Sequence, residues 1–215
     1  MNCIVTAGPT HEPLDRVRRL TNFSTGKLGV ELANYLTARG HWVTLFVGES
    51  ATYPGERRAA EVRTFTTTAS LRDGLMAMGV RPVEAVFHAA AVSDFAFGAV
   101  WERSPEGELK EIKSGKFSTR AGRLLVELVP TPKLIAELRG WFPQARLIGW
   151  KFEVDGRRED VVLAARRQLA EARTDLCVAN GPAYGPGFGL VSAADERSVA
   201  DAASLYTELE KFILR

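Results

Sequence analysis

A chain of 215 residues is long enough for one large domain with a well-buried core. Hydrophobic residues make up 46% and charged residues 25%, which is ordinary for a soluble globular protein. The formal net charge of +2 is too small to indicate general nucleic-acid binding, and no apolar run approaches the roughly 18 residues of a membrane span. The chain opens directly with a strand-like run rather than a signal peptide, so a cytoplasmic protein is expected.

Apolar runs alternate with segments of helical period along most of the chain. The expected strands are residues 2–6, 41–47, 60–65, 85–89, 146–151 and 176–179. The expected helices are residues 27–39, 68–78, 133–139, 157–172 and 198–214. Such alternation predicts parallel strands joined by helical crossovers, in one three-layer α/β/α, Rossmann-like domain over residues 1–215. Ligands of such sheets bind beyond the carboxyl ends of the strands.

Two kinds of residue inside the expected strands are predicted to be structural. Cys3 and Cys177 lie in apolar runs without Cys-x-x-Cys spacing, which argues against a disulfide scaffold or a zinc site and predicts buried thiols. His88 ends the fourth strand without a serine–histidine–acid pattern, so we expect a hydrogen-bonded structural histidine rather than a catalyst.

The alternation breaks between residues 95 and 130. This stretch holds a proline- and glycine-bearing segment at 101–107, the run Lys113-Ser-Gly-Lys116 and an alternating apolar run at 124–129. Long loops inside compact domains are usually functional or disordered. We expect a flap insertion over about residues 96–123 with a mobile basic tip, followed by a strand.

The loop after the first strand is the strongest functional signal. Such loops usually have about 2–6 residues, whereas this one runs over residues 8–24 and carries several arginines. It lacks the dinucleotide-binding and P-loop patterns and ends where Ser24 or Thr25 is expected to cap the first helix. Backbone amides at a glycine-bearing helix start, with cations nearby, bind anions. We therefore expect a phosphate site; the alternative is a well-capped helix with an exposed lysine.

Other polar residues are expected at the same edge of the sheet. Asp94 follows a run of small residues that permits close approach of a ligand, and it binds a ribose or a metal-bound phosphate, or else stabilises a turn. Lys113 and Lys116 suit closure over a triphosphate, with a solvated loop as the alternative. Lys151 and Asn180 lie at the ends of the last two expected strands.

Together these segments resemble phosphopantothenate–cysteine ligase (phosphopantothenoylcysteine synthetase), a family of coenzyme A biosynthesis, over nearly the whole chain. The matching motifs are Thr6-Ala-Gly-Pro-Thr-His-Glu-Pro-Leu-Asp15, Val17-Arg18, Asn22-Phe-Ser-Thr-Gly-Lys-Leu-Gly29, Ala89-Ala-Ala-Val-Ser-Asp94, Ile112-Lys-Ser-Gly115 and Asp175-Leu-Cys-Val-Ala-Asn180. Many bacterial members are fused to a flavin-dependent decarboxylase. No such half is present here, so a stand-alone ligase is expected.

The resemblance implies a two-step reaction. The carboxylate of 4'-phosphopantothenate attacks the α-phosphate of CTP or ATP, with Mg²⁺, and releases pyrophosphate; the amine of L-cysteine then attacks the acyl-nucleotide. A magnesium-bound triphosphate needs cations around it. The resemblance also implies a homodimer with its sites near the interface, and we expect neither nucleic acid nor a membrane as a partner.

Roles for individual residues are likewise carried by the resemblance. Asn22 is similar to the asparagine that holds the acyl-nucleotide, and Arg18 to the arginine that grips an anionic group. Lys113 is the preferred catalytic lysine of the flap, with Lys116 as its competitor. The implied binding residues are Gly8, Pro9, Thr10, Ser24, Gly26, Lys27, Ala89, Ala90, Ala91, Asp94, Lys116, Lys151 and Asn180. The run Trp150-Lys-Phe-Glu153 resembles the eukaryotic branch, which leaves CTP and ATP both open.

Two other functions fit the same kind of sheet. One is an NAD(P)-dependent reductase, although the chain lacks Gly-x-Gly-x-x-Gly and an obvious Tyr-x-x-x-Lys pair. The other is a nucleotide or pantothenate sensor that binds without turnover. Asn22 and the flap lysines favour catalysis over sensing.

Overall fold

The architecture is organised around one 8-stranded sheet, in the order β13-β12-β11-β10-β6-β1-β4-β5, in a computed structural model that describes residues 1–118 and 122–215. The parallel strands are β1 (Asn2–Ala7), β4 (Trp42–Gly48), β5 (Glu61–Phe65), β6 (Ala85–His88), β10 (Arg146–Phe152) and β11 (Leu176–Asn180). The central strands are almost continuously buried, as expected for parallel strands covered on both faces. The predicted mostly parallel, Rossmann-like sheet is confirmed.

In the described residues, five helices cover the two faces of this sheet. They are α1 (Lys27–Ala38), α2 (Thr68–Met78), α3 (Leu134–Trp141), α4 (Arg158–Ala172) and α5 (Ala202–Ile213). Leucines of α1 and α5 share one apolar core with the sheet, while α2 and α3 pack in a second core on the other face. Helix α4 packs on β11 and β12 in a third cluster. Because the central strands run parallel, their carboxyl ends lie together at one edge of the sheet.

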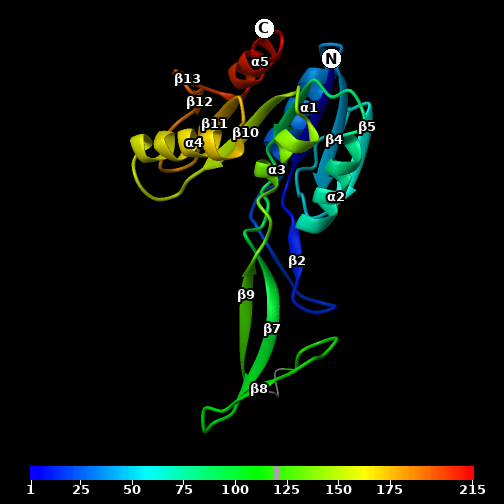
Figure 1. The fold of residues 1–215 in the computed structure, drawn as a ribbon, viewed down its shortest axis with the longest axis vertical. Helices are drawn as coiled ribbons and strands as arrows, with labels where there is room; N and C mark the ends of the chain where they lie inside the picture. Colours follow the sequence, from blue (N-terminus) through cyan, green and yellow to red (C-terminus); the bar gives the residue numbers. More distant parts are fainter. Residues whose placement is uncertain (119–121) are drawn as a thin grey trace.

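The segment between β6 and α3 forms an arm that projects from the α/β body (Figure 1). It is a 3-stranded antiparallel sheet of β7 (Phe95–Arg103), β8 (Leu109–Glu111) and β9 (Arg123–Pro130). The predicted flap insertion therefore has its own sheet, which begins one residue before the expected bound. Residues 119–121 of that insertion lie outside the described residues. A short hairpin of β2 (His11–Pro13) and β3 (Arg19–Thr21) lies near the base of the arm.

The structure corrects the expected carboxyl-terminal helix. Residues 196–199 form β13 (Glu196–Val199), which pairs antiparallel with β12 (Phe188–Val191), so the helix predicted from residue 198 begins only at Ala202. The side chain of Asp201 accepts a hydrogen bond from the Ser204 amide at 2.8 Å and so caps α5. An aspartate before the apolar periodicity was the signal for this start. Neither strand was predicted from the sequence. Strand β12 lies in a glycine-rich segment, which hides its apolar pattern.

The structural assignment of the two cysteines is confirmed. Cys3 and Cys177 are both free and buried. Burial raises the pKa of each thiol to about 12, so neither is a reactive thiolate at neutral pH.

None of the helices in the described ranges combines the length and the apolar character needed to cross a membrane.

Candidate functional site

Two sequence motifs meet where β1 and β6 end. Because these strands are neighbours in the sheet, their extensions continue side by side, and Pro9 bridges Ala91 in parallel register. The Thr10 amide donates to the Ala91 carbonyl at 3.1 Å, and the Ala91 amide donates to the Gly8 carbonyl at 3.0 Å. The buried Thr10 hydroxyl accepts from the Ser93 amide at 2.8 Å. The predicted binding residues of the first loop and of the alanine run thus form one backbone surface.

His88 supports this surface from within the core. Its Nδ1 lies 3.0 Å from the hydroxyl of Thr6, which also accepts a hydrogen bond from the Ala90 amide at 3.0 Å. Burial lowers the pKa of His88 to about 4, so the imidazole is neutral near pH 7. The prediction of a hydrogen-bonded structural histidine is confirmed.

Asn22 reaches the same surface from the long loop. Its side-chain Nδ2 donates to the carbonyl of Ala91 at 3.1 Å, while the Thr21 hydroxyl donates to the Thr10 carbonyl at 2.9 Å. The loop therefore folds back after β3 and lays Asn22 on the alanine run, although 69 residues separate the two in sequence. The residue itself is exposed, so its amide is accessible to a ligand.

The start of α1 adjoins this surface and differs from expectation. Its N-cap is Gly26, at φ +82°, which has no side chain to cap the helix, so the prediction of Ser24 or Thr25 as the N-cap residue is wrong. The Thr25 hydroxyl reaches only the Lys27 amide, at 3.3 Å. A side chain at Gly26 would place its Cβ 3.3 Å from the backbone of Gly8. The tight contact explains the glycine at the N-cap, and the first-turn amides after that of Lys27 suit an anion.

A cavity of about 350 Å³ opens at this helix start. Its lining combines residues of the matching motifs, of which Ser24, Gly26, Lys27 and Ala89 are predicted binding residues, with three from outside those motifs, namely Glu31, Phe188 and Ala202. The full lining is Ser24, Thr25, Gly26, Lys27, Leu28, Gly29, Glu31, Ala89, Phe188 and Ala202. Glu31 follows Lys27 by one helical turn, which was the available signal. Phe188 and Ala202 come from the unpredicted strand β12 and the corrected start of α5.

Arg18 has protein partners in this structure. Its Nη1 bonds Asp15 at 3.0 Å, and both terminal nitrogens donate to the carbonyl of Phe117 at 3.1 Å. The Arg16 amide also donates to the Gly115 carbonyl, at 3.0 Å. Burial acts to raise the pKa of Asp15, but amides of Val17, Phe117 and Arg18, with the Arg18 charge, lower it overall. The loop is thereby tied to the arm next to the lysine-bearing run.

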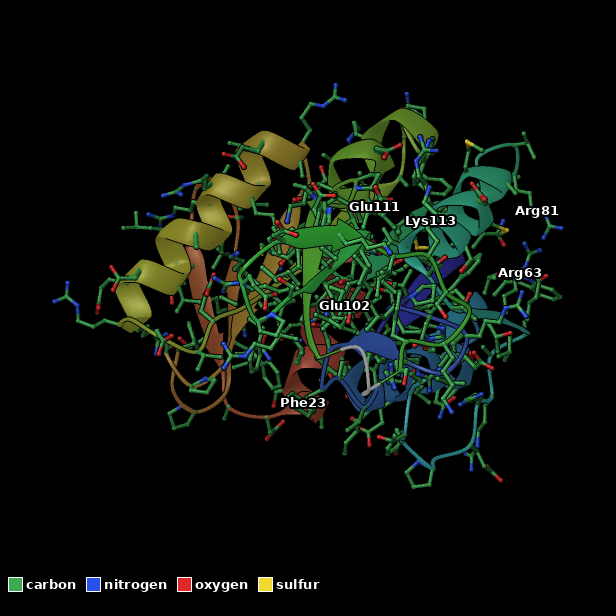
Figure 2. The ribbon with its side chains drawn as sticks, turned by 90° about the horizontal axis from the view of Figure 1, so that it is seen from below. Phe23, Arg63, Arg81, Glu102, Glu111 and Lys113 are labelled. Atoms are coloured by element: carbon green, nitrogen blue, oxygen red, sulfur yellow. The ribbon has the colours of Figure 1, made fainter. Side chains whose placement is uncertain are left out.

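The two flap lysines lie on the arm and not at the cavity. Lys113 is 90% exposed at its side chain, with Nζ 3.7 Å from the Glu111 carboxylate. Lys116 is also exposed. Figure 2 shows Lys113 with Glu111 on the arm, apart from Phe23, which neighbours Asn22. The contacts described within one chain do not join Lys113 to Asn22.

The remaining predicted residues lie along the carboxyl edge. Asp94 forms an ion pair with Lys133, a residue that sequence reasoning did not select and that precedes α3. Lys151 pairs with Glu153 at 3.0 Å. Asn180 lies opposite Phe152 in the β10–β11 register, and its Oδ1 is buried without a hydrogen-bond partner in the described part of the chain. Lys151 and Asn180 lie at the ends of β10 and β11, whereas Asp94 directly precedes β7, and none of the three lines the cavity at α1.

Metal ligands are sparse in this region. Within residues 1–118 and 122–215, no group of three or more His, Cys, Asp or Glu side chains is placed to hold a metal ion. Mg²⁺ bound to a nucleotide keeps several waters and takes only one or two protein carboxylates. Asp94 can supply one such oxygen, so the donor set fits a phosphate-borne Mg²⁺ better than a dedicated protein cage.

The amino-acid sequence is similar to one protein family and to curated members of a biosynthetic pathway. The family model of the DNA/pantothenate metabolism flavoprotein C-terminal domain matches residues 1–211. The coenzyme A biosynthesis bifunctional protein CoaBC of Thermococcus kodakarensis is 35% identical over 177 residues, which cover 82% of this chain and 40% of that protein. CoaBC of Bacillus subtilis is 31% identical over 187 residues, covering 86% and 42%. The chain thus spans about two fifths of the length of these curated relatives.

A solved structure carries the same fold across the whole chain. The DNA/pantothenate metabolism flavoprotein from Streptococcus pneumoniae has a TM-score of 0.87 and 27% identity, and the match covers 100% of this chain and 98% of that chain. The similarity includes both the α/β body and the arm, since so little of either chain is left unmatched.

Proposed function

Because the chain belongs to the family of the DNA/pantothenate metabolism flavoprotein C-terminal domain, we propose that it joins 4'-phosphopantothenate to L-cysteine through an acyl-nucleotide, in coenzyme A biosynthesis. The observation that carries the proposal is the contact of Asn22 with the Ala91 carbonyl, beside the uncapped start of α1. An anion site and a neutral amide donor then share one edge of the sheet. A cytoplasmic location stays a prediction.

In the first step, a carboxylate oxygen of phosphopantothenate attacks the α-phosphorus of the nucleotide. The bond to the β-phosphate oxygen breaks, and pyrophosphate leaves with that electron pair. The free amides at the start of α1 and the ammonium of Lys27 bind phosphate oxygens and stabilise their charge. Gly8, Pro9 and Thr10, with Ala89, Ala90 and Ala91, form the backbone wall along which the nucleotide lies.

In the second step, the amine of cysteine attacks the activated carbonyl. The carbon–oxygen bond to the nucleotide breaks, the nucleoside monophosphate leaves, and the amine nitrogen loses a proton as the amide forms. Asn22 donates from Nδ2 to the developing oxyanion without carrying charge itself. The Ala91 carbonyl holds that amide by accepting its other hydrogen.

Magnesium would be held chiefly by the triphosphate, with Asp94 as the candidate carboxylate. When bound, it would neutralise charge on the phosphates. Lys151 and Asn180, at the ends of β10 and β11, are the candidate contacts to the rest of the nucleotide, as is Ser24 at the loop end. The choice between CTP and ATP stays a prediction without a preferred outcome, since backbone contacts often select a base.

The position of the arm favours a homodimer in this proposal. Lys113 and Lys116 are exposed, neither lines the cavity of its own chain, and Figure 2 shows Lys113 on the arm. A second copy would allow the arm of one chain to bring a lysine to the site of the other. Lys113 remains the preferred catalytic lysine, because it occupies the matching motif position.

The experiment is an end-point assay of purified protein with phosphopantothenate, cysteine, Mg²⁺ and each of CTP, ATP, GTP and UTP. The expected result is pyrophosphate, nucleoside monophosphate and the amide in equal amounts, with CTP or ATP. Absence of pyrophosphate with every nucleotide would rule out the proposed ligase activity. Binding of a nucleotide without products would support the sensor, and protected NADPH fluorescence would support the reductase.

A further inference from the structure

The carboxylate of Glu31 is bound from three separate segments of the chain. Lys27, one turn earlier on α1, places Nζ 2.5 Å from Oε1. The hydroxyl of Tyr53, in the loop between β4 and β5, donates to the same oxygen at 2.9 Å. The hydroxyl of Tyr206, on α5, donates to Oε2 at 3.0 Å. All of these contacts are between side chains and none is a backbone hydrogen bond of a helix or a strand, so they form a separate polar network.

This network differs from an ordinary lysine–glutamate pair on a helix surface. Such a pair is weak because both side chains move freely in water. Here the Glu31 side chain is only 26% exposed, and Tyr206 is buried against Tyr35 with ring centroids 6.0 Å apart. Burial acts to raise the pKa of Glu31, but the three hydrogen bonds lower it overall. The carboxylate is therefore a fixed, ionised anchor.

The anchor sets the position of Lys27 at the cavity wall. Lys27 and Glu31 both line the cavity at the start of α1. The Lys27 ammonium also lies 5.6 Å from the centre of the Tyr53 ring, which restricts it from a second side. One of its three N–H groups goes to Glu31, which leaves the other N–H groups for a ligand oxygen.

We infer that Glu31, held by Tyr53 and Tyr206, is a positioning residue that orients Lys27 toward a phosphate group bound at the uncapped start of α1. The inference rests on the proposed function, and it adds three residues to the site that no sequence motif selected. Tyr53 and Tyr206 do not contact the phosphate in this arrangement. They act through Glu31, and Glu31 acts through Lys27.

Simple electrostatics makes the opposite prediction for Glu31. A negative charge next to an anion site weakens anion binding, so neutralising it by Glu31→Gln would tighten that binding. The positioning role predicts weaker binding, because the lysine loses its anchor. The two tyrosines separate the effects further, since Tyr53→Phe and Tyr206→Phe remove a hydrogen bond without changing any charge.

The test titrates inorganic pyrophosphate into the full chain with Mg²⁺ by calorimetry and measures KM and kcat for the preferred nucleotide. Expected results are a dissociation constant and a KM raised about fivefold by Tyr53→Phe and about tenfold by Glu31→Gln, with kcat changed less than about twofold. In a Lys27→Ala background, Tyr53→Phe should add nothing, because its target is gone.

Tyr35→Phe is the matched control. Tyr35 packs against Tyr206 and donates to Glu210 at 3.0 Å, so its loss disturbs the same pair of helices without touching Glu31. It should leave pyrophosphate binding unchanged. Thermal melts check that each variant folds, and Tyr53→Phe carries the test if Glu31→Gln does not fold.

The inference is wrong if Glu31→Gln tightens binding, if Tyr35→Phe weakens it as much as Tyr53→Phe, or if the Tyr53→Phe effect persists without Lys27. It is also wrong if pyrophosphate binds to Lys27→Ala as tightly as it binds to the wild-type chain. Amide formation by the wild-type protein is scored separately, so these outcomes leave the ligase proposal to its own assay.

Discussion

Arg18 donates to the carbonyl oxygen of Phe117 from both terminal nitrogens, at 3.1 Å each, across 99 residues of sequence. The same guanidinium bonds Asp15, whose side chain has 0% exposure and whose Oδ2 also accepts from the Phe117 amide at 3.2 Å. The long loop after β1 and the end of the lysine run on the arm are thereby held together. The role of Arg18 as a grip on a substrate anion stays a prediction.

Arg18→Lys tests the contact between loop and arm. A lysine offers a point charge instead of a planar fork, so it loses the second N–H bond to the Phe117 carbonyl and the fixed geometry of the guanidinium. We expect faster amide exchange over residues 112–117 in the free protein, with local opening easier by about 1 kcal/mol. Arg19→Lys is the control, because Arg19 lies on the same loop and contacts His11. Equal amide exchange in the two variants would contradict a specific role of Arg18 in holding the loop to the arm.

Asn22→Asp tests the step assigned to this side chain. An ionised aspartate cannot donate to an oxyanion and repels it, whereas the carboxylate of phosphopantothenate still attacks the nucleotide at the phosphate site. Pyrophosphate release should continue while the acyl-nucleotide accumulates and amide formation falls by about 10²-fold or more. Rapid quench followed by mass spectrometry detects the intermediate. Equal loss of both steps would show that the role is wrong.

The two arm lysines make a matched pair. Lys113→Ala should lower the rate of pyrophosphate release by about 10²-fold, because a cation near the triphosphate stabilises charge in the transition state. Lys116→Ala should lower it less than about tenfold. Single-turnover release of pyrophosphate measures both. The reverse order would assign the catalytic role to Lys116.

Gly29 and Gly140 are both helical glycines with opposite expectations. A Cβ at Gly29 would lie 2.6 Å from the Cβ of Ala7 and 2.9 Å from the carbonyl oxygen of Thr6, so Gly29→Ala pushes α1 off β1. We expect a loss of about 1–3 kcal/mol in the free energy of unfolding. Gly140 has nothing within 4 Å of its would-be Cβ, and Gly140→Ala should add about 0.5–1 kcal/mol. Urea melts compare the two; a loss in both variants would contradict the packing explanation.

His88 makes stability depend on pH. Its pKa falls from 6.5 to about 4 on folding. Between these values the unfolded chain binds a proton that the folded chain does not, so stability drops as pH falls through this window. The drop approaches roughly 3 kcal/mol near pH 4. His88→Asn keeps a polar atom near Thr6 without titrating. Urea melts at several pH values should show a flatter profile for this variant than for the wild type, and an identical profile would exclude His88 as the cause.

The alternation of strands and helices, the parallel sheet and the loops at its carboxyl edge could all be predicted from the order of the amino acids. Local periodicity carries those features, because a buried strand and an amphipathic helix each need their own spacing of apolar residues. The motif around Asn22 and the alanine run could also be placed at one edge, since the ends of neighbouring parallel strands meet there.

The contacts between side chains of distant segments became visible in the folded chain and could not be predicted from local patterns. The contacts of Glu31 with Tyr53 and Tyr206, and of Arg18 with Phe117, join residues that no local pattern relates. The uncapped start of α1 depends on how closely Gly26 approaches Gly8, which is a matter of packing. The last two strands of the sheet, β12 and β13, form by pairing with β11 and with each other, so their short segments carry little signal alone. Contacts between distant segments are set by the whole fold, and they decide how Lys27 and Arg18 are held.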